Sequence, residues 1–326
     1  MLAPNFWKSG NSGVLGALLS PLSWLYGFVT NARMTGKEPW VSPVPIICIG
    51  NLVIGGAGKT PVALDLAQRL KEKGRNVHFI SRGYGGHEKG PLRVEPTIHE
   101  FSRVGDEPLL LAAKAPTWVS QERRAGCVAA ANAGADIIIM DDGFQNPQVA
   151  KDFSIIVIDG CYGFGNKKLL PAGPLRETIS GGLARADAVV IIGEDRTGSS
   201  ILASSNGHKP MGASLVPDPL PEKIKDKPVV AFTGIGQPDK FFETISNLGC
   251  KIQERIPFGD HHPYSFADIN HLRDTAKKGN AHLVSTEKDA QRLPTSFLSE
   301  VTIIPVVLKW SDKEVIETLL DKINNV

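Results

Sequence analysis

A glycine-rich segment that ends in a lysine and a threonine is the first feature of the sequence that could do chemistry. Residues 46–61 read IICIGNLVIGGAGKTP, so an apolar run leads into a glycine-rich turn and then into Gly58-Lys59-Thr60. Glycines let backbone N–H groups converge on phosphate oxygens, and a helix beginning near Thr60 points its positive end at the same anion. Lys59 supplies a charge for the β- and γ-phosphates, and Thr60 supplies a hydroxyl for Mg²⁺. The segment therefore predicts a nucleotide-phosphate cradle.

This cradle departs from the usual pattern G-x-x-x-x-G-K-[ST] at one position. Val53 stands where the first glycine is expected, and two glycines lie inside the loop instead. The following VALDLAQRLKEKG is typical of an amphipathic helix ended by a glycine, so the strand–loop–helix context is met. A chance glycine-rich turn is the alternative. The residues expected around the nucleotide phosphates are Val53, Ile54, Gly55, Gly56, Ala57, Gly58, Lys59 and Thr60.

Two adjacent carboxylates at the end of a strand are the second expected component. The segment ADIIIMDDGFQN places four apolar residues directly before Asp141 and Asp142. P-loop proteins hold Mg²⁺ with an acidic residue at such a strand end. A hydrogen-bonded cap is the structural alternative for either carboxylate. Because the cradle is present, we expect one carboxylate to hold the metal and the other to contact a neighbouring group.

Charged motifs also lie between these two components. Arg82, in SRGYGG, follows an apolar run and so falls at the edge where parallel sheets bind ligands. Asp106 and Glu107, in VGDEP, are by themselves typical of solvated loop carboxylates. The motif QERRAG offers Arg123 and Arg124 at a helix start, where one of them could contact phosphate.

Three later motifs carry further polar side chains. GNKKLLPAGPLRE contains two prolines that forbid a regular helix, so with Arg176 and Glu177 it indicates an active-site wall. FGDHHPYSF has too few ligands for a metal site alone, and a His–carboxylate pair for proton transfer is the better interpretation. STEKDA is typical either of a charged helix cap or of part of a nucleotide pocket.

The elements that must position these residues alternate between short apolar runs and helix-like stretches. Runs that are apolar throughout are typical of parallel strands covered on both faces. We therefore expect an α/β fold with right-handed crossovers. A stretch rich in Ser, Gly, Pro and Lys at 199–228 predicts a domain boundary. The expected strands are 45–50, 77–81, 137–140, 155–158, 189–192, 229–232, 282–285 and 302–308.

Length, charge and cysteine content limit the class of protein. A chain of 326 residues with 42% apolar residues suffices for one large or two ordinary domains. A formal charge of +2 gives no argument for a nucleic-acid partner. The four cysteines lie far apart, without metal or redox spacing, so we expect reduced thiols in a cytosolic protein.

The N-terminal segment is unusual because no charged residue occurs between Lys8 and Arg33. It lacks a good cleavage site for a secretory signal, and its apolar part is shorter than the roughly 20 residues of a membrane span. An interfacial amphipathic helix and a core helix are the other interpretations, and the first is favoured. Trp24 and Tyr26 suit a headgroup boundary. The apolar face would carry Leu15, Leu18, Leu19, Leu22, Leu25, Tyr26 and Val29, opposite Gly16, Ser20, Ser23, Gly27 and Thr30.

Taken together, the motifs resemble one family, the tetraacyldisaccharide 4′-kinases of lipid A biosynthesis. The match runs nearly end to end and rests on GNLVIGGAGKTP, SRGYGG, VGDEP, DDGFQ, LLPAGPLRE, FGDHHPY and STEKDA, in that order. The resemblance implies transfer of the ATP γ-phosphoryl group, with Mg²⁺, to the 4′-hydroxyl of a tetraacylated glucosamine disaccharide 1-phosphate, giving lipid IVA. It implies an N-terminal membrane-associating helix at 1–35, a P-loop NTPase-like core at 36–205 and a smaller second α/β lobe at 206–326.

The resemblance also implies roles for individual residues. Asp106 matches the proposed catalytic base and His261 its partner, although whether His261 or His262 acts stays open, as does the choice between Arg123 and Arg124. Lys59, Arg123 and Arg176 are implied active-site groups. The candidates for the metal and its surroundings are Thr60, Glu107, Asp141, Asp142, Gln145 and Glu177.

The implied location is the cytoplasmic face of a Gram-negative inner membrane, with peripheral attachment through the N-terminal helix. The implied partner is the glycolipid substrate, with no nucleic acid and no obligate protein partner. Two other functions share part of the pattern. One is a membrane-recruited P-loop ATPase acting as a switch or sorting factor, and the other is a kinase of soluble small molecules.

Overall fold

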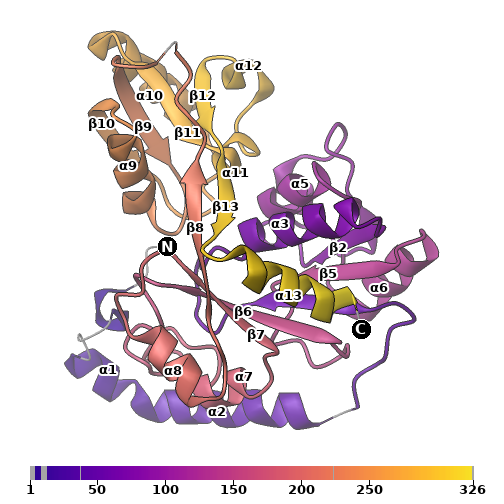
Figure 1. The fold of residues 1–326 in the computed structure, drawn as a ribbon. Coiled ribbons are helices and arrows are strands. Elements are labelled where there is room, and N and C mark those ends of the chain that lie inside the picture. Colours follow the sequence, from indigo (N-terminus) through magenta and orange to yellow (C-terminus); the bar gives the residue numbers. More distant parts are fainter. Residues whose placement is uncertain (1–3, 9–12, 37, 223, 325–326) are drawn as a thin grey trace.

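The computed structural model describes residues 4–8, 13–36, 38–222 and 224–324, and a nine-stranded sheet forms its centre (Figure 1). The strands are β1 (Ile46–Gly50), β2 (Val77–Ser81), β3 (Leu92–Arg93), β4 (Thr117–Val119), β5 (Ile137–Asp141), β6 (Phe153–Asp159), β7 (Ala188–Ile192), β8 (Met211–Pro217) and β13 (Val306–Trp310). Their spatial order is β13-β8-β7-β6-β1-β5-β2-β4-β3. All neighbours from β8 to β4 pair in parallel, and β13 and β3 are antiparallel edge strands.

The central strands form because their branched apolar residues are buried on both faces of the sheet. Strands β1 and β5 are buried at every position, and Ile47 lies opposite Ile139. Helices α3 (Lys59–Glu72), α5 (Asp106–Ala112) and α13 (Lys313–Asn324) pack on one face. Helices α6 (Arg123–Asn132), α7 (Ile179–Leu183) and α8 (Ser199–Ser205) pack on the other. The predicted mostly parallel α/β fold is confirmed.

A smaller parallel sheet forms a second lobe above the first in Figure 1. Its strands, in spatial order, are β10 (Lys251–Pro257), β9 (Pro228–Thr233), β11 (His282–Thr286) and β12 (Val301–Ile304). Helices α9 (Pro238–Asn247) and α10 (Phe266–Gly279) pack on opposite faces of this sheet, and the short helices α11 (Glu287–Ala290) and α12 (Thr295–Leu298) follow β11.

Seven of the eight expected strands are present with ends within two residues of the prediction, but the expected strand 302–308 is wrong as a single element. It is divided at Pro305, which lacks an N–H group and has a fixed φ. Strand β12 ends before this proline in the small sheet, and β13 begins after it and pairs antiparallel with β8 in the large sheet. The chain therefore crosses from one lobe to the other at Pro305.

This crossing gives the lobes different limits from those expected from the sequence. The stretch 199–228, expected as a boundary, contains α8 and β8, and both belong to the first lobe. Residues 306–324 also return to the first lobe, where α13 packs beside α3. In the chain, the small sheet is therefore inserted between β8 and β13, two strands that pair antiparallel with each other and connect the lobes (Figure 1).

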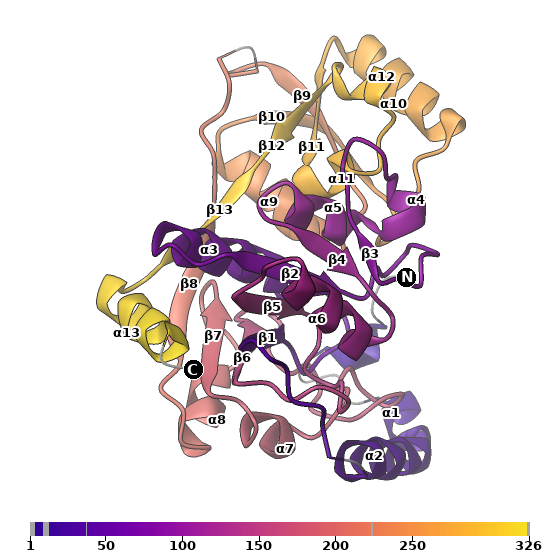
Figure 2. The same cartoon turned by 90° about the vertical axis from the view of Figure 1, so that its right-hand side faces the viewer.

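The N-terminal segment forms two helices, α1 (Val14–Leu18) and α2 (Ser20–Thr35), on the outside of the first lobe (Figure 2). Their small residues face the protein, since Ser23 Oγ donates to Leu169 O at 2.9 Å and accepts from Ala172 N at 3.0 Å. The apolar side chains face outward, and Trp24 is 83% exposed and Phe28 75%. Within the residues that the structure describes, no helix combines the length and apolar character needed to cross a bilayer.

Candidate active site

The loop after β1 has the backbone conformation that a phosphate cradle needs. Gly55 and Gly58 have φ values of 114° and 85°, in the left-handed region that favours glycine. A Cβ atom added at Gly55 or Gly56 would meet nothing within 4 Å, so the loop is open on that side. Val53, in contrast, is buried and bridges Leu175. Its side chain therefore packs in the core, and only its backbone could approach a phosphate.

Lys59 opens α3 and contacts a carboxylate rather than solvent. Its Nζ lies 3.5 Å from Oδ1 of Asp142, and the same oxygen is 2.8 Å from Nη1 of Arg176. Burial acts to raise the pKa of Asp142, but the two cations outweigh it and lower this pKa to about 2. Asp142 has a φ of 52°, which turns the chain just after β5. Asp142 therefore holds two cations at the cradle.

Gln145 and Glu177, both expected near a metal, form a supporting chain behind Arg176. Gln145 accepts from Arg176 Nη1 at 3.3 Å and donates to Glu177 Oε1 at 3.0 Å. The other oxygen of Glu177 pairs with Arg185 at 2.7 Å. Glu177 is 7% exposed. Both carboxylate oxygens of Glu177 therefore already accept hydrogen bonds from the protein. Glu177 thus holds the active-site wall formed by LLPAGPLRE in place.

Asp141 has the environment of a cation ligand. It is 1% exposed, and its Oδ1 has no partner among the described residues. Burial and the nearby Glu107 raise the pKa of Asp141 to about 7. No group of three or more His, Cys, Asp or Glu side chains suited to a metal gathers in the described part of the chain. Mg²⁺ at a nucleotide typically needs only one or two carboxylates besides phosphates and waters, so Asp141 and Thr60 fit that ion.

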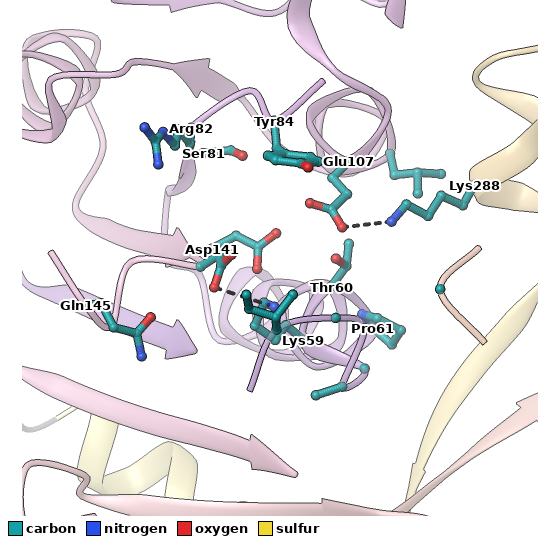
Figure 3. Close-up of a pocket in the computed structure, with 18 of the residues that line it drawn as sticks. Lys59, Thr60, Pro61, Ser81, Arg82, Tyr84, Glu107, Asp141, Gln145 and Lys288 are labelled. Carbon is teal, nitrogen blue, oxygen red and sulfur yellow. Dashed lines mark hydrogen bonds and ion pairs between the residues drawn. The ribbon is translucent and has the colours of Figure 1, made fainter. Parts of the chain in front are cut away.

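The second lobe brings three side chains to the start of α5. His261 Nδ1 lies 3.0 Å from both carboxylate oxygens of Asp106. Arg292 Nε lies 3.3 Å from Asp106 Oδ2. Lys288 Nζ pairs with Glu107 at 3.0 Å, as Figure 3 shows. The acidic pair of VGDEP is therefore held by the other lobe rather than solvated.

The charge state of Asp106 follows from these contacts. The side chain is 2% exposed, and burial acts to raise its pKa. The hydrogen bond from His261 and the charges of Lys288 and Arg292 outweigh that effect and leave the pKa of Asp106 below its ordinary value. Asp106 is thus an ionised carboxylate in contact with an imidazole, the arrangement used for proton transfer.

His262 points away from this pair. Its ring stacks on Phe258 with centroids 4.7 Å apart, and its Nε2 lies 3.1 Å from Asp268 Oδ2. His261 is instead beside Tyr84, with ring centroids 5.1 Å apart. The geometry thus distinguishes the two adjacent histidines, and only His261 contacts Asp106.

Arginines occupy the same edge of the sheet further from the cradle. Arg123 is 4% exposed, and its Nη1 donates to Ser120 O. Burial and the neighbouring Arg82 lower the pKa of Arg123. Arg124 is exposed and its guanidinium lies 5.6 Å from the Trp40 ring centroid. Both line the cavity described next.

One cavity of about 2390 Å³ joins these groups. It extends from Pro305, where the chain crosses between the lobes, past the cradle and Asp141, to α2 on the outside of the first lobe. Figure 3 shows Tyr84, Glu107 and Lys288 on one side of the cradle and Gln145 on another. The cavity could hold a nucleotide at the cradle and an acceptor along the arm toward α2.

Several residues of the site were missed by the sequence analysis. Arg292 is 1% exposed and also pairs with Asp289 at 2.6 Å. The only signal for it was its position three residues after an acidic residue of STEKDA. Lys240 of the second lobe pairs with Asp159 of the first. Tyr84 was also missed, although it lies within the motif SRGYGG. Contacts between lobes leave no local pattern that would identify them.

The chain is similar to known kinases over nearly its whole length. The family model described as Tetraacyldisaccharide-1-P 4'-kinase matches residues 15–324. Proteins named tetraacyldisaccharide 4'-kinase from Rhodospirillum centenum and Paramagnetospirillum magneticum are each 48% identical, and the alignments cover 98% and 99% of this chain and 96% and 99% of theirs. The crystal structure of LpxK from Aquifex aeolicus in complex with ATP is 28% identical, with a TM-score of 0.75, covering 95% of this chain and 99% of that one.

Proposed function

Because this chain belongs to the tetraacyldisaccharide-1-phosphate 4′-kinase family, we propose that it transfers the γ-phosphoryl group of ATP to the 4′-hydroxyl of a tetraacyldisaccharide 1-phosphate, giving lipid IVA. The observation that carries this proposal is the contact between Asp106 and His261, which lines the same cavity as the cradle. An ATPase switch needs the cradle and the acidic strand. It has no need of a proton acceptor supplied jointly by two lobes.

Different residues of the site have different roles in the reaction. The Asp106–His261 pair accepts the proton that the sugar hydroxyl loses as phosphoryl transfer proceeds. Lys59 and Arg176 offset the negative charge on the transferred group, which is the main catalytic requirement of phosphoryl transfer. Thr60 and Asp141 are the groups that would hold Mg²⁺, which would offset negative charge on the nucleotide phosphates. Lys288 keeps Glu107 in place beside them.

The acceptor is a glycolipid, and the N-terminal helices are suited to reach the membrane that contains it. On α2, Leu22, Leu25 and Phe28 are 55%, 61% and 75% exposed. The opposite, small-residue face packs on 168–172 through Ser23 and Gly27. Exposed apolar surface of this kind is typical of an interfacial helix.

The residues that line the cavity also agree with a position of α2 at the membrane. It is lined by Tyr26, Val29 and Arg33 of α2 as well as by Lys59. An acceptor could therefore keep its acyl chains in the lipid while its sugar reaches the cradle. We infer peripheral attachment to the cytoplasmic face of the inner membrane, where ATP is available.

The direct test is γ-³²P transfer from ATP to tetraacyldisaccharide 1-phosphate in detergent micelles, with and without Mg²⁺. We expect Mg²⁺-dependent label in the lipid. Release of inorganic phosphate stimulated by vesicles, with no label in the lipid, would replace the proposal with the ATPase switch. Label in a water-soluble acceptor but not in the lipid would point to a kinase of small molecules.

A further inference from the structure

The inward face of α2 contacts the loop that leads into the active-site wall. This wall loop, residues 166–176, contains most of LLPAGPLRE. Ser23 is 5% exposed, and its Oγ donates to Leu169 O at 2.9 Å and accepts from Ala172 N at 3.0 Å. Leu19 O, within the N-terminal segment itself, lies further from this hydroxyl, at 3.3 Å. Ser23 therefore joins the helix to the wall loop at two points.

The residues before the N-terminal helices hold the same loop. Trp7 Nε1 donates to Pro171 O at 3.1 Å. Asn166 N donates to Trp7 O at 2.8 Å, and Asn166 Nδ2 donates to Phe6 O at 2.8 Å. Irregular backbone that is covered by other segments needs a partner for each of its polar groups. For the first part of the wall loop, the N-terminal segment supplies several of these partners.

The other end of the wall loop is attached to the phosphate cradle. Pro174 O accepts from Ile54 N at 2.9 Å, and Arg176 N donates to Leu52 O at 2.8 Å. From this position the guanidinium of Arg176 reaches Asp142 at 2.8 Å. The wall loop thus connects the N-terminal segment, which holds residues 166–172, with the cradle, which holds residues 174–176.

The hydroxyl of Ser23 is important to this loop because it accepts a buried donor. Ala172 is 0% exposed, so its N–H group loses its acceptor in a buried place if the hydroxyl is removed. A buried donor without an acceptor is costly, and the loop regains a partner only by moving. Arg176 comes four positions after Ala172, so such a movement changes where its guanidinium lies. A catalytic charge acts fully only when it is held at the reacting group.

We propose that Ser23 is a positioning residue for Arg176, so that α2 takes part in catalysis as well as in membrane attachment. This inference rests on the proposed function and gives the N-terminal segment a second role in it. Ser23 does not line the cavity, so it acts through the wall loop rather than on ATP or the acceptor. The outward face of α2 meets the lipid, and the inward face holds the loop that carries Arg176.

The test is a double-mutant cycle on kcat, with saturating ATP and tetraacyldisaccharide 1-phosphate in micelles. We expect Ser23→Ala to lower kcat by about tenfold to a hundredfold, the effect of misplacing a catalytic group by roughly 1 Å. In an Arg176→Ala background the same substitution should lower kcat by less than about twofold, because the group that Ser23 positions is already absent. Ser20→Ala is the matched control, since Ser20 Oγ donates to Gly16 O at 2.8 Å, within the N-terminal segment.

Two binding measurements separate positioning from folding and from membrane attachment. Calorimetry with ATP counts the folded sites, and sedimentation with vesicles containing phosphatidylglycerol measures attachment. Ser23→Ala should keep both affinities within about threefold of the wild-type values, because the cradle glycines and the outward face of α2 are unchanged. If Ser23→Ala does not fold, Trp7→Phe takes its place in the cycle, because it removes the donor to Pro171 O and keeps an aromatic ring.

Three results would overturn the inference. One is an equal loss of kcat with and without Arg176, which would mean that Ser23 does not act through that side chain. Another is no loss of kcat in Ser23→Ala, or the same loss in Ser20→Ala. The third is a loss of vesicle binding that accounts for the lower activity. In each case the wild-type protein still labels the lipid, so the proposed function survives. If the wild-type protein labels no lipid, the proposed function itself fails.

Discussion

Nδ1 of His261 lies 3.0 Å from both carboxylate oxygens of Asp106, although the two residues come from different lobes. Asp106 is the first residue of α5 in the large-sheet lobe, and His261 follows β10 in the small-sheet lobe. The proton-accepting pair therefore exists only while the lobes are together. Lys240 with Asp159 and Lys288 with Glu107 are further ion pairs across the same boundary.

Replacing either member of this pair should remove proton transfer without removing the nucleotide site. We expect Asp106→Asn and His261→Ala each to lower kcat by about 10²- to 10⁴-fold, the usual contribution of a general base. ATP affinity, measured by calorimetry, should stay near the wild-type value because the cradle is unchanged. His262→Ala is the matched control and should leave kcat largely intact, since His262 contacts Asp268 instead. Unchanged kcat in Asp106→Asn, or a loss of activity explained entirely by weaker ATP binding, would refute the assignment.

Lys59 should contribute to catalysis, by offsetting the negative charge of the transferred phosphoryl group, rather than to folding. Lys59→Ala is expected to lower kcat/KM by about 10²- to 10³-fold, because the charge that offsets the phosphoryl group is lost. Lys73→Ala, at the other end of α3, provides the control and should leave the kinetics unchanged, since Lys73 pairs with Glu317 and Asp321 on the surface. Equal effects of the two substitutions would mean that Lys59 matters only for the stability of the helix.

Local sequence patterns were enough to predict where the first half of the candidate site lies. The cradle, the acidic strand end and the parallel sheet each arise from residues close together in the chain. Short buried runs such as IICIG and IIIMD have one stable arrangement, in which both faces are covered. The positions of seven strands could be predicted from that constraint alone. The division of the eighth at Pro305 could not be predicted, because the segments before and after this proline are equally apolar.

Contacts between distant segments could not be predicted in the same way. Glu177 was expected near the metal because of the family resemblance, but its carboxylate pairs with Arg185, which lies one helix later in the chain. Arg292 was not predicted, because the local sequence around an arginine buried between two lobes does not differ from that around an arginine exposed on the protein surface. Only the tertiary arrangement brings Arg292 to within 3.3 Å of Asp106.

Arg292 should stabilise the second lobe as well as the catalytic pair. It is 1% exposed, pairs with Asp289 at 2.6 Å and donates to Gly234 O at 3.0 Å. Arg292→Met leaves the carboxylate of Asp289 buried without its cation, which should lower the free energy of unfolding by about 3–5 kcal/mol. Chemical denaturation measures this. Arg196→Met, which breaks an exposed pair with Glu194, is the control and should change stability little. A change in Arg292→Met no larger than in that control would contradict the buried role.

Asp195 should make stability depend on pH. Burial acts to raise its pKa, but hydrogen bonds from Ser200, Thr197 and Ser199 hold the pKa well below the ordinary value of 3.8. The ionised form thus favours the folded state. Its contribution is complete above the unfolded pKa and is lost as pH falls through the folded one.

Asp195→Ala should therefore lower the free energy of unfolding by about 1 kcal/mol near neutral pH, as for a lost helix cap. The difference from wild type should stay constant from about pH 5 upward and shrink below about pH 4. Urea denaturation at several pH values measures it, with Glu194→Ala as the neighbouring control. A difference that grows as the pH falls would have the wrong sign for this explanation.

The outward face of α2 should control membrane attachment and leave the fold alone. Changing Leu22, Leu25 and Phe28 together to serine removes side chains that are already exposed, so the melting temperature should stay near the wild-type value. In an interfacial helix the same side chains enter the lipid, and each contributes roughly tenfold to partitioning when it is well buried. Sedimentation with vesicles containing phosphatidylglycerol should therefore show binding weakened by at least about a hundredfold. Serine at Ile98 and Ile201, exposed apolar positions elsewhere, is the matched control. Unchanged vesicle binding in the α2 variant, or an equal loss in the control, would mean that this face does not meet the membrane.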